Sequence, residues 1–173
     1  KLYNARWSLE RTRRDHKLRI DEAAFQSASA IIKELQPAVL ETTSLDSLRG
    51  LEGVGATAYF SVFDHMILRE KVSFFFHGRN RRPPLDNVNA LLSFVYSLLT
   101  NDCASALESV GLDSYVGFLH RDRPGRTSLA LDLMEELRPC LADRFVLTCI
   151  NNKIANGADF HQEESGAVRL SDE

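Results

Sequence analysis

The chain has 173 residues, of which 44% are hydrophobic and 26% are charged. These proportions are typical of a globular domain and exclude a chain that is disordered throughout, collagen-like or of low complexity. The 21 basic and 24 acidic residues give a net charge of −3, which excludes a general polycation that coats nucleic acid but allows local basic patches.

The first part of the chain has the apolar spacing of helices. Residues 1–16 are polar and basic, with apolar side chains at helical intervals. An acidic first turn opens a predicted amphipathic helix over residues 21–37, which we expect to end at its proline. Apolar residues recur over residues 44–68 with a period of about 3.6, and Thr43 or Ser44 is the expected cap.

The second part predicts further helices separated by loops. Asp86 is the expected cap of a leucine-rich helix over residues 87–110. Another helix is expected to start at residues 127–128. It is kinked or broken at residues 138–139, because the proline there removes a helix hydrogen bond. Apolar periodicity resumes over residues 140–154.

Only two short stretches, residues 72–77 and residues 167–170, have the character of extended chain. We therefore predict an all-α fold, with residues 1–173 forming a single helical domain. The chain begins with Lys1 rather than methionine, and we interpret it as a fragment of a longer protein.

The cysteines indicate a reducing environment. Cys103, Cys140 and Cys149 are odd in number, form no CxxC pair and have apolar neighbours, so we expect buried thiols. We find no apolar run of the roughly 18 residues that a membrane span needs and no signal peptide. These features predict a cytoplasmic protein without a membrane segment.

Three segments carry polar residues in apolar surroundings. Glu52 lies among three glycines on an otherwise apolar helix, and glycines cost about 1 kcal/mol each in a helix, so their grouping indicates close approach of another backbone or a ligand. His120 follows an apolar run, and neutral imidazole is the commonest metal ligand. Asp132 and Glu135 share a helix face, where like charges repel unless a cation or basic group lies between them.

Each feature also has an ordinary structural explanation. Glu52 fits a solvated residue at a frayed turn, His120 fits a core or surface residue, and the two carboxylates fit a solvated acidic face. Taken together, Glu52, His120 and Glu135 supply a mixed nitrogen and oxygen ligand set that suits Mg²⁺ or Mn²⁺. Two basic loops are candidates for holding a DNA backbone nearby, through Arg79, Arg81, Arg82, Arg121, Arg123 and Arg126. Sequence spacing alone does not join these segments.

Four stretches of the chain resemble one known family. They resemble the helical C-terminal domain of the CRISPR-associated endonuclease/integrase that inserts new spacers (the Cas-one family), in its subtype I-C form. The resemblance covers nearly the whole chain. It runs through residues 1–6, Leu48-Arg49-Gly50-Leu51-Glu52-Gly53, residues 82–94, and residues 117–139 with Gly117-Phe118-Leu119-His120.

The resemblance implies a metal site on Glu52, His120 and Glu135, with Asp132 at an auxiliary acidic position. The implied cofactor is Mg²⁺ or Mn²⁺. The implied chemistry is transesterification, in which the 3′-hydroxyl of a prespacer end attacks a phosphodiester of the CRISPR repeat, and nuclease cleavage uses the same site. Tyr96 matches a tyrosine of the family and is a candidate for DNA contact or for the core.

The family also implies partners. These are prespacer and repeat DNA, a second copy in a full-length homodimer, and the small CRISPR-associated Cas-two protein. The implied location is the prokaryotic cytoplasm. The N-terminal β domain through which the family dimerises is absent from this sequence.

Two other hypotheses remain open. A non-catalytic helical DNA-binding module would use the basic loops but would have no task for Glu52, His120 and Glu135. A structural interaction domain would need only a helical core, which the 10 phenylalanines could fill, and would show no salt-dependent affinity for DNA.

Overall fold

The computed structural model describes residues 1–121 and 123–171, and confirms the all-α class. Asp122, in the second basic loop, lies outside the described residues. The longer helices are α1 (Leu2–His16), α2 (Glu22–Glu41), α3 (Leu45–Ser61), α4 (Asn87–Ser109), α5 (Ser128–Leu137) and α6 (Asp143–Asn151). The shorter elements are η1 (Lys17–Arg19), η2 (Phe63–Met66), η3 (Arg138–Ala142), η4 (Gly157–Asp159), β1 (Phe160–Gln162) and β2 (Val168–Leu170).

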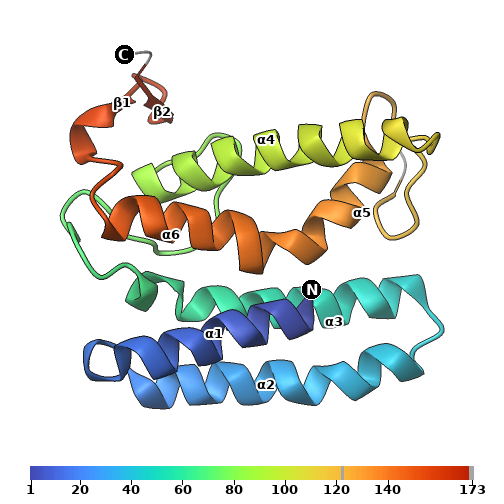
Figure 1. The fold of residues 1–173 in the computed structure, drawn as a ribbon, viewed down its shortest axis with the longest axis horizontal. Coiled ribbons are helices and arrows are strands. Elements are labelled where there is room, and N and C mark those ends of the chain that lie inside the picture. The colour runs from blue at the N-terminus through green and yellow to red at the C-terminus, as the bar shows by residue number, and fades with distance from the viewer. Residues whose placement is uncertain (122, 172–173) are drawn as a thin grey trace.

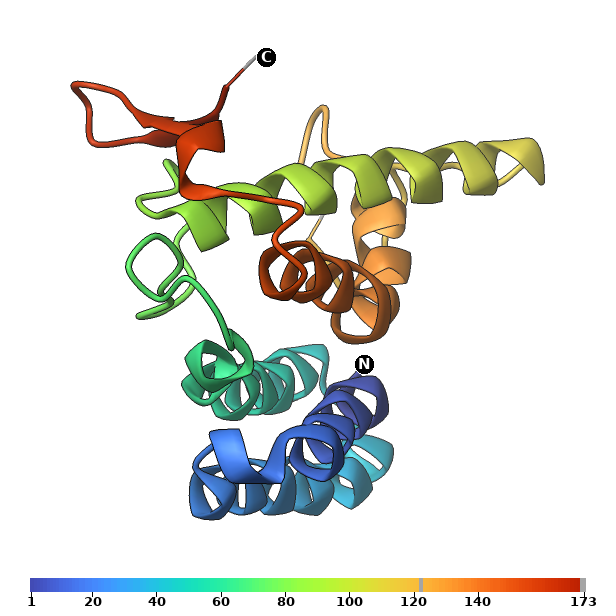
Figure 2. The same cartoon turned by 60° about the vertical axis from the view of Figure 1, so that its left-hand side comes forward.

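The helices form two layers (Figure 1). α1, α2 and α3 pack side by side in one layer, while α4, α5 and α6 form the other, and residues 62–86 cross between them along one side of the molecule. Figure 2 shows the C-terminal hairpin standing beyond α6, close to the start of α4. The N-terminus lies between the two layers, so the first residue of α1 faces both.

One cluster of buried apolar side chains spans both layers. Helical spacing turns these side chains inward, because residues three or four apart share a face. Phe63 and Phe76 extend the cluster where the chain crosses between the layers, with ring centroids 4.9 Å apart. The largest fully buried members are Leu9, Phe25, Ile32, Phe63, Ile67, Phe74, Val88, Leu92, Met134, Val146 and Ile150.

Two predicted boundaries are wrong. The second helix does not end at Pro37 but continues to Glu41, because the proline removes one hydrogen bond of the helix and the turns on either side keep theirs. The periodic stretch over residues 44–68 is divided, because α3 ends at Ser61 and η2 follows. The predicted caps Ser44 and Asp86 are confirmed, with side chains that accept from the backbone N–H groups three residues later.

Residues 72–77 are not a strand. Their backbone N–H groups bond within the segment and its neighbours: Phe74 N–H donates to the Glu70 carbonyl at 2.8 Å and Phe76 N–H donates to Asp64 Oδ1 at 2.8 Å. The second extended stretch is confirmed as β2, and its antiparallel partner β1 was not predicted.

The predicted kink at residues 138–139 takes the form of a π-helical turn, η3, which joins α5 directly to α6. Because the turn is wider than an α-helical one, it absorbs the proline without breaking the chain of helices.

By length and composition, α4 could cross a membrane, with a mean hydropathy of 1.2 over its most apolar 18 residues. The apolar composition of α4 is also explained by its place in the core. Val88, Leu92 and Cys103 are buried against the rest of the domain, so α4 serves as a core helix. Of the three expected buried thiols, only Cys103 is buried, whereas Cys140 and Cys149 are half-buried, and all three are free.

Candidate active site

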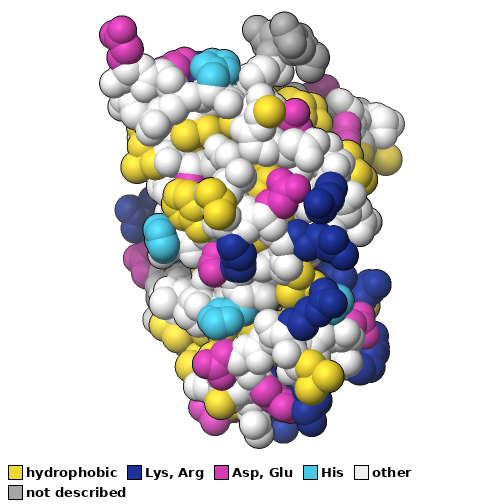
Figure 3. Space-filling view, turned by 90° about the vertical axis from the view of Figure 1, so that its left-hand side faces the viewer, with side chains coloured by type: hydrophobic (Ala, Val, Ile, Leu, Met, Phe, Trp, Pro, Cys, Tyr) yellow, Lys and Arg dark blue, Asp and Glu magenta, His cyan; other side chains and the backbone are white. Residues whose placement is uncertain are grey.

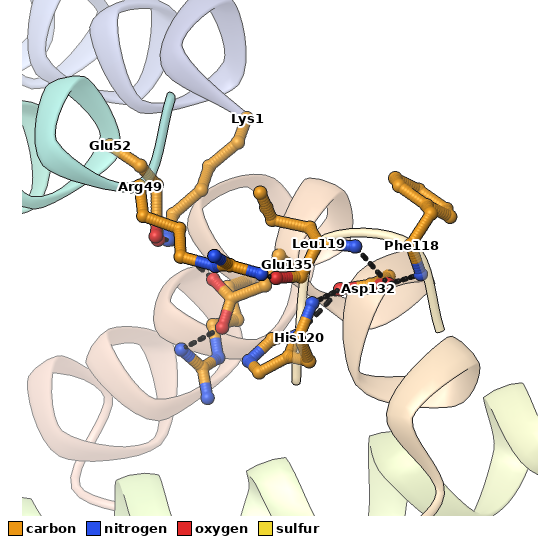
Figure 4. A network of polar contacts seen from close by, with 9 residues as sticks. Lys1, Arg49, Glu52, Phe118, Leu119, His120, Asp132 and Glu135 are labelled. Carbon is orange, nitrogen blue, oxygen red and sulfur yellow. Dashed lines mark hydrogen bonds and ion pairs between the residues drawn. The ribbon is translucent and has the colours of Figure 1, made fainter. Parts of the chain in front are cut away.

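Glu52, His120 and Glu135 come together in one cavity of about 560 Å³. Glu52 extends from α3, Glu135 from α5, and His120 from the loop between α4 and α5 (Figure 4). The layer arrangement explains the meeting, because α3 belongs to one layer and α5 to the other. The packing of the two layers therefore brings together three segments whose proximity could not be inferred from their spacing in the sequence.

Two basic side chains hold the glutamates. The Lys1 ammonium forms ion pairs with Glu52 Oε1 and with Glu135 Oε2, the second at 2.5 Å. Arg138 Nη1 lies 2.5 Å from Glu135 Oε1, so both oxygens of that carboxylate are paired. Figure 4 shows Lys1 reaching down from the start of α1 between the two glutamates.

Glu135 is held in its ionised form. Its side chain is only 9% exposed, and this burial acts to raise its pKa. The positive charges of Arg138 and Lys1 outweigh burial, so the pKa of Glu135 lies below its ordinary value.

Asp132 lies under the loop that carries His120. Its carboxylate accepts the backbone N–H groups of Phe118, Leu119 and His120 at 2.8–2.9 Å, and its Oδ1 lies 2.6 Å from His120 Nδ1. Burial alone would raise the pKa of Asp132, but these hydrogen bonds outweigh it and lower the pKa. An ionised carboxylate only accepts, so Nδ1 carries the shared proton, and in the neutral ring Nε2 is the free nitrogen.

The same loop is fixed at two further points. Arg49 Nε donates to the Leu119 carbonyl at 2.8 Å. A Cβ at Gly117 would come within 2.6 Å of Ser128 Cβ and 2.9 Å of the Ser128 backbone, so only glycine fits there. Together these contacts hold the His120 backbone in place against α5.

The contacts around the three glycines near Glu52 account for only one of them. A Cβ at Gly55 would overlap Leu2 Cδ2, so the atom that approaches this glycine belongs to a side chain and not to the predicted backbone or ligand. Cβ atoms at Gly50 and Gly53 would meet nothing within 4 Å, so no other backbone of the described chain approaches these two, and a ligand beside them stays a prediction.

The six arginines of the basic loops divide into two groups. Arg79, Arg81 and Arg126 line the cavity with the three candidate residues, whereas Arg82, Arg121 and Arg123 are exposed residues that are not among its lining. Arg121 instead lies 3.2 Å from Asp46.

Arg79 also has a structural task. Its guanidinium donates to Asn89 Oδ1 at 2.6 Å and to Ser93 Oγ at 3.2 Å, which ties the first basic loop to α4. Tyr96 is buried beneath it, and the Arg79 and Arg138 guanidiniums lie 5.2 and 4.3 Å from its ring centroid. Of the two roles considered for Tyr96, its burial favours the core.

The two glutamates already converge on one positive charge, the Lys1 ammonium. Carboxylate oxygens from two elements, with an imidazole nitrogen nearby, are donors that fit Mg²⁺ or Mn²⁺. Among residues 1–121 and 123–171, no three His, Cys, Asp or Glu side chains are already grouped closely enough to hold a metal ion. Displacement of Lys1 is therefore part of any metal binding here.

All 173 residues match the family described as CRISPR associated protein Cas1. The chain belongs to the Cas1 family. It is 49% identical over 173 residues to a CRISPR-associated endonuclease Cas1 of Chlorobaculum tepidum, covering all of this chain and 50% of that protein. It is 47% identical to the Cas1 endonuclease of Leptospira interrogans, covering 68% of that protein. The chain thus spans about half the length of the first of these Cas1 relatives.

Solved structures agree with the Cas1 assignment. A casposase bound to its integration product matches 99% of this chain and 48% of its own, with a TM-score of 0.75 and 28% identity. The Cas1-containing chain of a Cas6-RT-Cas1–Cas2 complex matches 98% of this chain and 18% of its own, with a TM-score of 0.81 and 30% identity.

Sequence reasoning missed two residues of this Cas1 site. Arg138 had a signal, since it lies three residues after Glu135 on the same helical path, where opposite charges meet. Lys1 had none, because only the packing of α1 between the layers brings it to residues 51 and 134 positions away.

Proposed function

We propose that this chain is the catalytic part of a DNA endonuclease/integrase that inserts spacer DNA into a CRISPR array. The observation that carries the proposal is the convergence of Glu52, His120 and Glu135 in one cavity lined by arginines. In the proposed reaction a DNA 3′-hydroxyl attacks a phosphodiester of the repeat, a new phosphodiester forms, and the displaced 3′-oxygen leaves and takes up a proton.

We further propose that Mg²⁺ or Mn²⁺ is held by Glu52, His120 Nε2 and Glu135. Such an ion supplies charge neutralisation at the phosphate and activation of the hydroxyl. Asp132 orients His120 through Nδ1, as partners of metal-binding histidines do. Arg79, Arg81 and Arg126 line the cavity where the DNA backbone would pass, and their charges favour phosphate there.

The relatives support the proposed partners. One similar structure is a casposase bound to an integration product, and another contains Cas1 and Cas2. We therefore propose DNA and Cas2 as partners of the full-length protein, which we expect to act as a homodimer. A DNA-binding module without catalysis is the alternative that the experiment below separates.

The decisive experiment compares variants of the full-length protein in a strand-transfer assay with prespacer and repeat DNA. We expect Glu52→Gln, His120→Ala and Glu135→Gln to lower the rate about 100-fold or more, because each removes a group that acts on the reacting phosphate. Glu136→Gln is the matched control, since Glu136 is an exposed neighbour on α5. Wild-type rates in the three variants would overturn the proposal.

Metal and DNA binding complete the test. Calorimetric titration with Mn²⁺ should show saturable binding in the wild type and in Glu136→Gln, and loss of it in Glu52→Gln. DNA affinity measured without metal should be retained in all variants, because the arginines are unchanged. If DNA affinity is retained but the wild type neither joins strands nor binds Mn²⁺, the module without catalysis is the correct function.

A further inference from the structure

We propose that a second cavity, at the far end of α1, binds a backbone phosphate of the same DNA; this inference rests on the proposed function. The cavity has a volume of about 290 Å³ and lies between the end of α1, residues 66–69 and α6. Its polar lining consists of Thr12, His16, Arg19, Arg69, Arg144 and Thr148, with Asn151 and Asn152 beside them. It shares no residue with the cavity of Glu52 and Glu135.

The lining is positive and has no acidic member. Within the described parts of the chain, Arg19, Arg69 and Arg144 have no carboxylate within ion-pair distance, although most arginines near them do. Two acidic residues close to the lining in the sequence, Asp15 and Glu70, have other partners. Asp15 is paired with Arg11 and Arg14, and Glu70 lies 3.8 Å from Lys153. Unpaired cations that face one hollow attract an anion.

The cavity is preformed. Asn151 anchors its wall, since its Oδ1 accepts the Leu68 N–H at 2.8 Å and its Nδ2 donates to the Met66 carbonyl at 2.9 Å. Arg144 is half-buried and donates to Thr12 Oγ1 at 3.4 Å, which joins two residues of the lining. A phosphate would therefore meet donors that are already in position.

The chemistry of the lining favours a phosphodiester over a base. Guanidinium groups match the geometry of phosphate oxygens, whereas the cavity has no tyrosine, tryptophan or phenylalanine on which a base could stack. On the face drawn in Figure 3, most Lys and Arg side chains lie in the right half, with acidic side chains among them.

The length of α1 sets the spacing of the two sites. Its first residue lies beside Lys1 at the glutamates and its last, His16, lines the basic cavity. Fifteen helical residues at about 1.5 Å each give a separation of about 22 Å. Duplex DNA rises about 3.4 Å per base pair, so the two sites are spaced for phosphates about six to seven base pairs apart.

The test measures how DNA affinity depends on salt in the full-length protein. We expect the exposed pair Arg19→Gln with Arg69→Gln to reduce the slope of log affinity against log salt by about 1, because the cavity holds one phosphate and each phosphate contact contributes about 0.9. The matched control is Lys33→Gln with Arg169→Gln, which removes the same charge from exposed sites on α2 and β2. An unchanged slope in the first pair, or an equal loss in the control, would overturn the inference.

This outcome is separable from that of the proposed function. At saturating DNA, the Arg19→Gln/Arg69→Gln protein should join strands at the wild-type rate, whereas Glu52→Gln should lose joining and keep the wild-type salt slope. An active Glu52→Gln protein would refute the catalytic site and leave the salt result standing. A lower slope accompanied by a lower melting temperature would be checked with Arg69→Lys, which keeps the charge and should restore the slope.

Discussion

Two carboxylates three residues apart on α5 have different tasks. Glu135 faces the cavity and two cations, while Asp132 is turned under the loop of His120, where it accepts every hydrogen bond that it makes. The repulsion expected between the two carboxylates is relieved by the basic groups beside Glu135, which are Lys1 and Arg138. Their chemistry is therefore set by what faces each one rather than by their shared helix.

Asp132→Asn should disturb His120 more than it disturbs α5. The amide cannot accept from all its present donors, because one of its two atoms becomes a donor itself. We expect strand transfer to fall about 10- to 100-fold. Nitrogen NMR of His120 should show the proton leaving Nδ1. An unchanged tautomer with reduced activity would show that Asp132 acts in some other way.

At the scale of elements, the loop from α4 to α5 depends on one glycine. Gly117 lies against Ser128, the first residue of α5, and no Cβ fits between them. Gly53, on α3, has open space at the same position. A side chain is therefore excluded by lack of space at Gly117 but not at Gly53.

Substitution by alanine should separate them. Gly117→Ala should lower the free energy of unfolding by about 1–3 kcal/mol, because Ser128 backbone must move to admit the methyl group. Gly53→Ala should raise it by about 0.5–1 kcal/mol, since alanine is the better helix former. Urea denaturation measures both. Equal effects of the two substitutions would contradict the contact described at Gly117.

At the scale of the whole molecule, a buried carboxyl lies where α6 meets α4. The Tyr96 hydroxyl donates to Asp143 Oδ1, and Arg138 covers the Tyr96 ring. Burial raises the pKa of Asp143 to about 6, although the Tyr96 hydrogen bond and the charges of Arg138 and Arg79 oppose it. The folded state therefore favours the protonated form of Asp143.

This pKa sets a pH dependence. The stability that protonated Asp143 contributes is complete below its ordinary pKa of about 4 and is lost as the pH rises through about 6. A shift of about two pKa units corresponds to about 3 kcal/mol. Asp143→Asn stays neutral, so its free energy of unfolding relative to wild type should rise by about that amount between about pH 4 and pH 7. Asp102→Asn, on the exposed side of α4, should show no such trend.

The helices could be predicted from the sequence, but the way in which they pack against one another could not. Capping side chains and apolar spacing act locally, which is why Ser44, Asp86 and the length of α4 were predictable. Residues 72–77 were mistaken for extended chain, because their β-branched and aromatic composition says nothing of the turn that Glu70 closes. Lys1 reaches the glutamates only because α1 packs between the layers, so no local sequence pattern predicts its ion pairs.

The pairing of Lys1 and Arg138 with two glutamates leaves this group of four electrically balanced. A divalent ion that displaces Lys1 from the two glutamates would leave a surplus of one positive charge beside Arg138, and a nucleic acid is well suited to cancel that surplus. Metal and DNA should then strengthen each other's affinity, and by linkage they do so by the same factor. We therefore expect Mn²⁺ to bind more weakly in the absence of DNA than in its presence.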